Sequence, residues 1–93
     1  MSDIPKAIEK MRMEDINKEI LRAGMIAELD AVSLYEQLAA TTNKPEIRKV
    51  LMDIAKEEKT HMGEFQALLL NEDREQAQEL EEGRKEVKDL TGK

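Results

Sequence analysis

The sequence predicts an all-α protein, in which two long helices form an antiparallel hairpin and a short helix follows at the C-terminal end. Of its 93 residues, 40% are hydrophobic and 39% are charged, whereas only 2% are aromatic. This composition favours amphipathic helices over sheets. The chain has only two prolines and four glycines, and its apolar residues recur at steps of three and four along two long segments, as one face of a helix requires.

The first helix is expected from Glu14 to Ala40, because this stretch contains no proline and a single glycine, Gly24. The acidic residues Glu14 and Asp15 suit the positive end of a helix dipole. Residues 1–13 show little periodicity and are expected to form an N-terminal extension.

A short turn at residues 41–44 is expected to lead into the second helix. Pro45 suits the first position of a helix and disfavours α geometry at Lys44. We therefore expect the second helix to run from Pro45 to about Leu70. So short a connection makes the two helices an antiparallel hairpin, which we assign to residues 14–70.

The remaining segment, residues 71–93, is expected to form a weaker amphipathic helix and a tail. Asp73 and Gln76 have the spacing of a capping box at its start. Gly83 is expected to interrupt this helix. Its apolar side consists of Ala77, Leu80, Val87 and Leu90.

Composition also excludes several kinds of function. The chain has no cysteine, so any metal must be bound by oxygen and nitrogen ligands. The formal net charge of −6 opposes binding to nucleic acid or to anionic membranes. No apolar run approaches the ~18 residues of a membrane span, and the first residues lack the apolar stretch of a signal peptide. We therefore expect a cytoplasmic protein that, being small, associates with another chain.

Polar side chains interrupt the apolar stripes of both long helices. Glu58 and His61 stand within the stripe of the second helix, among Ile47, Leu51, Ile54, Phe65 and Leu68. Glu28 stands within the stripe of the first helix, among Leu21, Met25, Val32 and Ala39. A buried carboxylate without a partner costs roughly several kcal/mol, so something must compensate it.

Each of these residues alone has an ordinary explanation. Glu28 could form a buried ion pair or a hydrogen bond to Tyr35, and His61 could be a satisfied core histidine. A lone Glu-x-x-His is a weak signal in a chain this rich in glutamate. Together, however, a carboxylate that faces a Glu-x-x-His on the neighbouring helix is half of the di-iron carboxylate pattern. We therefore predict that Glu28, Glu58 and His61 bind metal and that a second chain completes the site.

The residue types suit redox chemistry at a pair of metal ions. Carboxylates can bridge two metals and stabilise the oxidised ion, and one imidazole per metal leaves positions open for dioxygen. Iron is favoured over zinc, with manganese as an alternative. Tyr35 lies on the face of Glu28, where it either contacts the site or fills the core. Asp30, Glu36 and Glu57 are expected to be solvated surface charges, with the alternative that one of them helps iron to enter.

At these residues the chain resembles the encapsulated ferritins, which are ferritin-like proteins housed in encapsulin nanocompartments. The segments AELDAVSLYEQ (27–37) and KEEKTHMGEFQALL (56–69) carry the resemblance, which extends over residues 14–92. It is strongest to the ferritin-like domain that some archaea carry fused ahead of an encapsulin shell domain.

The resemblance implies an antiparallel homodimer that builds a ferritin-like four-helix bundle, and further assembly into a decameric ring. It places a ferroxidase centre with two irons at the dimer interface. The implied ligands are Glu28, Glu58 and His61, with Tyr35 near the centre, and these four are the implied catalytic residues.

The resemblance also implies that Fe(II) is oxidised by dioxygen and that the product is mineralised and stored inside the encapsulin shell, which would be a partner of this chain. Asp30 matches one position of an acidic cluster that guides iron in some members, whereas Ala27 stands where an acid is often found. We find neither a following shell domain nor the short Gly/Leu-rich targeting peptide of free cargo. We therefore expect an excised domain of a shell fusion, or cargo delivered in another way.

Two alternatives remain open from the sequence. One is a structural helical dimer or cargo module, in which a buried polar layer sets the register of the helices. The other is a rubrerythrin-like peroxide reductase, against which the absence of cysteines for a rubredoxin-type electron donor argues.

Overall fold

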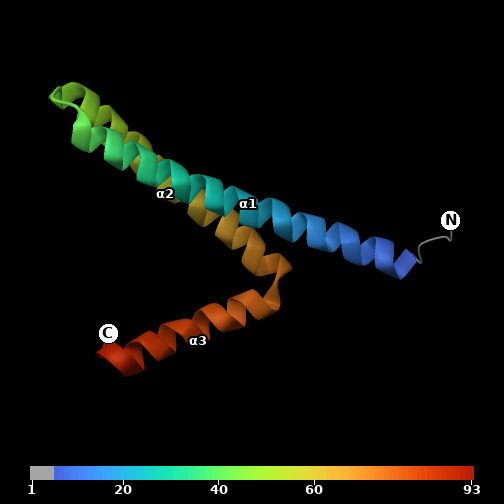
Figure 1. Ribbon diagram of the computed structural model, residues 1–93. Helices are drawn as coiled ribbons and strands as arrows, with labels where there is room; N and C mark the ends of the chain where they lie inside the picture. The colour runs from blue at the N-terminus through green and yellow to red at the C-terminus, as the bar shows by residue number, and fades with distance from the viewer. Residues whose placement is uncertain (1–5) are drawn as a thin grey trace.

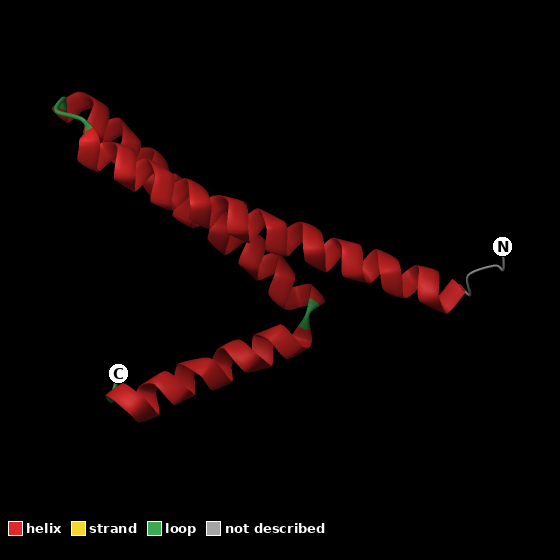
Figure 2. Cartoon of the chain, viewed as in Figure 1, coloured by secondary structure: helices red, strands yellow, loops and turns green. Residues whose placement is uncertain are grey.

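The computed structural model describes the backbone of residues 6–93 and the side chains from residue 12 onward. Three α-helices account for nearly all of this part of the chain: α1 (Lys6–Thr41), α2 (Pro45–Glu72) and α3 (Arg74–Thr91) (Figures 1 and 2). The predicted all-α architecture, a hairpin of two long helices followed by a shorter one, is confirmed.

Two predicted boundaries within these helices are wrong. α1 begins at Lys6 and not at the predicted Glu14, so residues 6–13 are helical, while residues 1–5 of the predicted N-terminal extension lie outside the described part. The segment 6–13 lacks proline and glycine and is rich in good helix formers, which outweighs its weak periodicity. α3 continues through Gly83 without a break.

The turn between α1 and α2 is held by the side chain of Arg48. Its Nε donates to the carbonyl of Ala39 at 3.0 Å, and its Nη2 donates to the carbonyl of Thr42 at 2.8 Å. Lys44 has extended backbone angles (φ −104°, ψ 115°), and Pro45 begins α2, as expected for a residue that precedes proline. The two helices therefore run antiparallel and side by side (Figure 1).

The interface between α1 and α2 buries few side chains. From residue 12 onward, the buried hydrophobic residues are Val32, Ala39, Ala55 and Leu69, and small side chains among them allow the helices to approach closely. Many larger apolar side chains remain exposed, including Ile20 at 58% and Leu34 at 51%. None of the described helices is long and apolar enough to cross a membrane.

Asp73 alone separates α2 from α3. Its backbone N–H donates to the carbonyl of Leu69, closing α2 at 2.8 Å. Its carboxylate accepts from the backbone N–H of Gln76 and from Arg22 Nη2, each at 3.0 Å. The predicted cap at Asp73 is confirmed, and α3 diverges from the hairpin at this point (Figure 1). Gly92, in the left-handed conformation (φ 78°), ends α3.

Candidate metal centre

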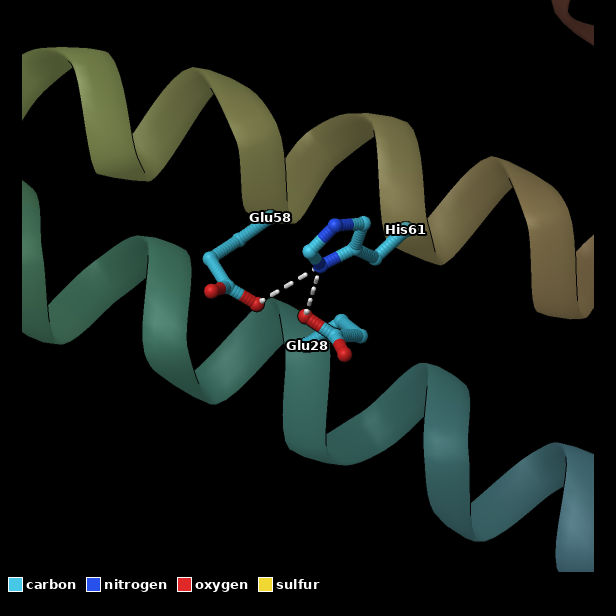
Figure 3. A group of neighbouring side chains, drawn as sticks. All are labelled: Glu28, Glu58 and His61. Carbon is cyan, nitrogen blue, oxygen red and sulfur yellow. Dashed lines mark ion pairs between the residues drawn. The ribbon is translucent and has the colours of Figure 1, made fainter.

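Glu28 of α1 meets Glu58 and His61 of α2 near the middle of the hairpin (Figure 3). The spacing of three residues places Glu58 and His61 on one face of α2, and the antiparallel register brings Glu28 opposite to them. One possible ligand atom from each residue lies within 4.8 Å of the others. The structure thus brings together the three residues that the sequence singles out.

His61 Nδ1 is the atom at which the three side chains converge. It lies 3.6 Å from Glu28 Oε2 and 3.5 Å from Glu58 Oε2. Hydrogen bonds between nitrogen and oxygen are typically about 2.7–3.2 Å long, so neither contact is a good hydrogen bond. Nδ1 is therefore the imidazole nitrogen that is placed to bind a metal ion together with both carboxylates.

The two carboxylates are more buried than the imidazole. The side chains of Glu28 and Glu58 are 18% and 19% exposed, against 47% for His61. Glu28 Oε2 is buried and has no hydrogen-bond partner among the described residues. An anionic oxygen in this position is costly unless a cation or donor approaches it. The orphaned oxygen and its oxygen and nitrogen neighbours fit a metal ion such as iron, manganese or zinc.

A surface hollow adjoins these residues. It is lined by Glu28, His61, Glu64, Phe65 and Leu68. Sequence reasoning did not assign Glu64 and Phe65 to the site, although they follow His61 by three and four residues and so lie on its face of α2.

The lesser candidates lie outside the cluster of Glu28, Glu58 and His61. Tyr35 is half-buried on α1, about two turns from Glu28 on the same face. Asp30 and Glu57 are exposed, and Glu36 pairs with Lys59 at 3.2 Å near the surface. These three acidic residues are surface charges, as expected.

The helical hairpin and the carboxylate and histidine cluster within it define a ferritin-like helical protein. The family model for rubrerythrin matches residues 19–91. A ferritin-like-encapsulin shell fusion protein from Pyrococcus furiosus is 60% identical to this chain over 74 residues, which make up 80% of this chain and 21% of that protein. The chain thus spans about a fifth of that relative's length.

A solved structure of a ferritin-like domain matches nearly the whole chain. The crystal structure of the encapsulated ferritin domain from Pyrococcus furiosus matches with a TM-score of 0.80 and 51% sequence identity, covering 99% of this chain and 88% of that one. This chain therefore belongs to the rubrerythrin family, and within it to the encapsulated ferritin-like domains.

Proposed function

We propose that this chain is a ferroxidase of the encapsulated-ferritin type. Two chains pair antiparallel, and Glu28, Glu58 and His61 of each chain bind two Fe(II) ions between them as substrate. The observation that supports this most directly is the buried Oε2 of Glu28, which lies beside Glu58 and His61 and has no hydrogen-bond partner in the described part of the chain. Two copies supply four carboxylates and two imidazoles, the full set of the di-iron carboxylate pattern.

The residues of the site would divide the work by their chemistry. Each bound Fe(II) gives up one electron, and a pair reduces one dioxygen by two electrons to hydrogen peroxide, with two protons taken from water. Glu28 and Glu58 would favour oxidation, because anionic oxygens bind Fe(III) more strongly than Fe(II). His61, with Nδ1 facing both carboxylates, would supply one neutral ligand to each ion. Tyr35 would lie near the centre.

The relatives support a compartment for the oxidised product. The Pyrococcus relative is described as a fusion with an encapsulin shell, and the matching crystal structure is described as an encapsulated ferritin domain. We infer that this chain acts inside an encapsulin nanocompartment as a dimer-based ring, and that the shell stores the Fe(III) mineral.

The test is Fe(II) oxidation in air by the purified chain, followed through the absorbance of Fe(III). Wild type should oxidise Fe(II) faster than buffer, and bind two irons per dimer. Glu58→Ala should lose at least ~100-fold of the rate, because it removes a ligand from each metal. Glu57→Ala, which changes an exposed neighbour on α2, should retain the wild-type rate. Oxidation no faster than buffer, or full activity in Glu58→Ala, contradicts the proposal.

The rubrerythrin match also fits a peroxide reductase at the same site. Consumption of hydrogen peroxide by the Fe(II)-loaded protein, compared with consumption of dioxygen, separates the two activities. A ferroxidase should oxidise Fe(II) with dioxygen at least as fast as it does with added hydrogen peroxide.

A further inference from the structure

Phe65 packs against the backbone of α1 at Gly24, next to the candidate metal centre. Gly24 precedes Glu28 by four residues, and Phe65 follows His61 by four residues. In an antiparallel hairpin these offsets run in the same direction, so the Gly24–Phe65 contact lies about one turn, or about 6 Å, from Glu28 and His61. Phe65 also lines the same hollow as those two residues.

The contact leaves no room for a side chain at position 24. A Cβ atom there would lie 2.9 Å from each of Cδ1, Cε1 and Cζ of Phe65. Non-bonded carbon atoms are optimally about 3.5–4.0 Å apart. Because the aromatic ring is rigid, it cannot withdraw one atom as a long flexible side chain could. Either the whole ring or one of the helices must move.

Gly63 provides the contrast. It lies on α2 only two residues from Phe65, and a Cβ atom at this position would meet nothing within 4 Å. The requirement for glycine at position 24 therefore comes from the ring of Phe65 and not from a general need for glycine in these helices.

We propose that Gly24 and Phe65 are positioning residues for the metal centre. Seated on the bare backbone at Gly24, the Phe65 ring sets the separation of α1 and α2 where Glu28 faces His61. Neither residue offers a ligand atom, so both act through Glu28 and His61. This inference rests on the proposed function.

The size of the expected displacement supports this assignment. Raising a 2.9 Å contact to the roughly 3.5 Å of ordinary contact requires a shift of about 0.6 Å. Metal and catalytic sites tolerate displacements of about 0.5 Å. If one of the helices takes up this shift, a single added methyl group at Gly24 is enough to disturb ligands that approach the metal from two different helices.

The experiment measures Co(II) binding to the full chain, because the visible absorption of Co(II) reports both affinity and ligand geometry. Each variant is compared at a protein concentration at which it elutes with wild type in size-exclusion chromatography. Gly24→Ala should weaken Co(II) binding by ~10-fold or more and alter the visible spectrum, whereas the matched control Gly63→Ala should bind as wild type does.

A double variant tests whether the two residues act through their contact. Phe65→Leu removes the ring and should also weaken Co(II) binding. Combining it with Gly24→Ala places a methyl group in the vacated space, so the double variant should bind Co(II) more tightly than either single variant. A purely structural role would lower the thermal midpoint of the metal-free protein and leave the Co(II) affinity and spectrum unchanged.

The outcomes separate this inference from the function on which it rests. If wild type does not bind Co(II), both the metal centre and the inference fail. If wild type binds Co(II) and Gly24→Ala binds it equally well, or if Gly63→Ala loses as much affinity, the inference alone is overturned. Should Gly24→Ala fail to fold, the comparison of Phe65→Leu with the double variant decides, and equal affinities of those two overturn the inference.

Discussion

The substitution Glu28→Gln separates a metal ligand from a structural ion pair. Glutamine keeps the shape of the side chain and removes its charge. Glu28 Oε2 is buried without a hydrogen-bond partner among the described residues, and the side chain is only 18% exposed. If the carboxylate is placed there to bind metal, the metal-free protein should be more stable without the charge.

The magnitude follows from the burial of this oxygen. A buried polar group without a partner costs about 1–3 kcal/mol, and more when it is charged. Glutamine still buries a polar atom, so only part of this cost is recovered, and we expect a gain of about 1 kcal/mol. For a domain of this size, that raises the thermal midpoint by about 4–8 °C. With metal at about 100 times its dissociation constant, wild type instead gains about 2.7 kcal/mol, which the variant forgoes.

The assay is thermal unfolding at one fixed protomer concentration, with chelator and with Co(II). Glu28→Gln should melt above wild type in chelator and below it in Co(II). Glu36→Gln is the matched control on α1, because the ion pair of Glu36 with Lys59 lies between side chains that are 41% and 60% exposed and such pairs contribute about 0–1 kcal/mol. A clear loss of metal-free stability in Glu28→Gln would refute the reasoning and favour a structural polar layer.

Two further predictions concern α3. The backbone N–H of Gln76, and the positive charges of Lys18 and Arg22, lower the pKa of Asp73 below its ordinary value of 3.8. The stability that the carboxylate contributes is therefore present above about pH 4 and is lost as the pH falls through the lower pKa of the folded state. Circular dichroism should show this loss of helix in wild type, whereas Asp73→Asn should lack the step. Gly83→Ala should raise stability by about 1 kcal/mol in chemical denaturation, because alanine favours the helix and a Cβ atom there meets nothing within 4 Å. A persistent acid step in Asp73→Asn, or destabilisation by Gly83→Ala, would contradict these accounts.

The meeting of Glu28, Glu58 and His61 could be predicted from sequence because periodicity reports position on a helix. Glu28, Glu58 and His61 stand where apolar residues are expected, and a short turn fixes an antiparallel pairing of the two helices. These two constraints are enough to place a residue of α1 opposite a residue of α2. Tyr35 differs, because the sequence predicts that it shares a face with Glu28, and no hydrogen bond or ion pair among the described residues assigns it a function.

The contact between Gly24 and Phe65 could not be predicted from helical periodicity. From the sequence, a glycine in a helix only lowers the stability of that helix, and Phe65 is one more residue of the apolar stripe. Only the register and separation of the helices show that a Cβ atom at position 24 would collide with the ring. The sequence pattern defines which faces meet, but it does not define the distance between them.

Gly83 shows the opposite case, because a local rule predicts a break in α3 that does not occur. Glycine disfavours a helix by about 1 kcal/mol, and this suggested a break in α3. Two ion pairs span the glycine, and each joins residues about one turn apart: Glu81 with Arg84 at 2.6 Å and Glu82 with Lys85 at 3.5 Å. Pairs of this spacing each favour the helix by a few tenths of a kcal/mol, about 0.2–0.5. Together with the cap at Asp73, these pairs offset much of the free energy that glycine costs the helix.

In the proposed dimer, the exposed apolar surface would link metal binding to pairing of the chains. Large side chains such as Ile20, Leu34 and Leu38 are 58%, 51% and 43% exposed, and a second chain would bury such surface at a gain of about 25 cal/mol per Å². Pairing through the proposed site, however, would also gather four carboxylates in a place with little water, and their repulsion opposes the apolar gain. Bound cations remove this repulsion. On the proposed arrangement, metal binding and dimer formation must therefore strengthen one another, since a ligand that stabilises the dimer is itself bound more tightly by the dimer.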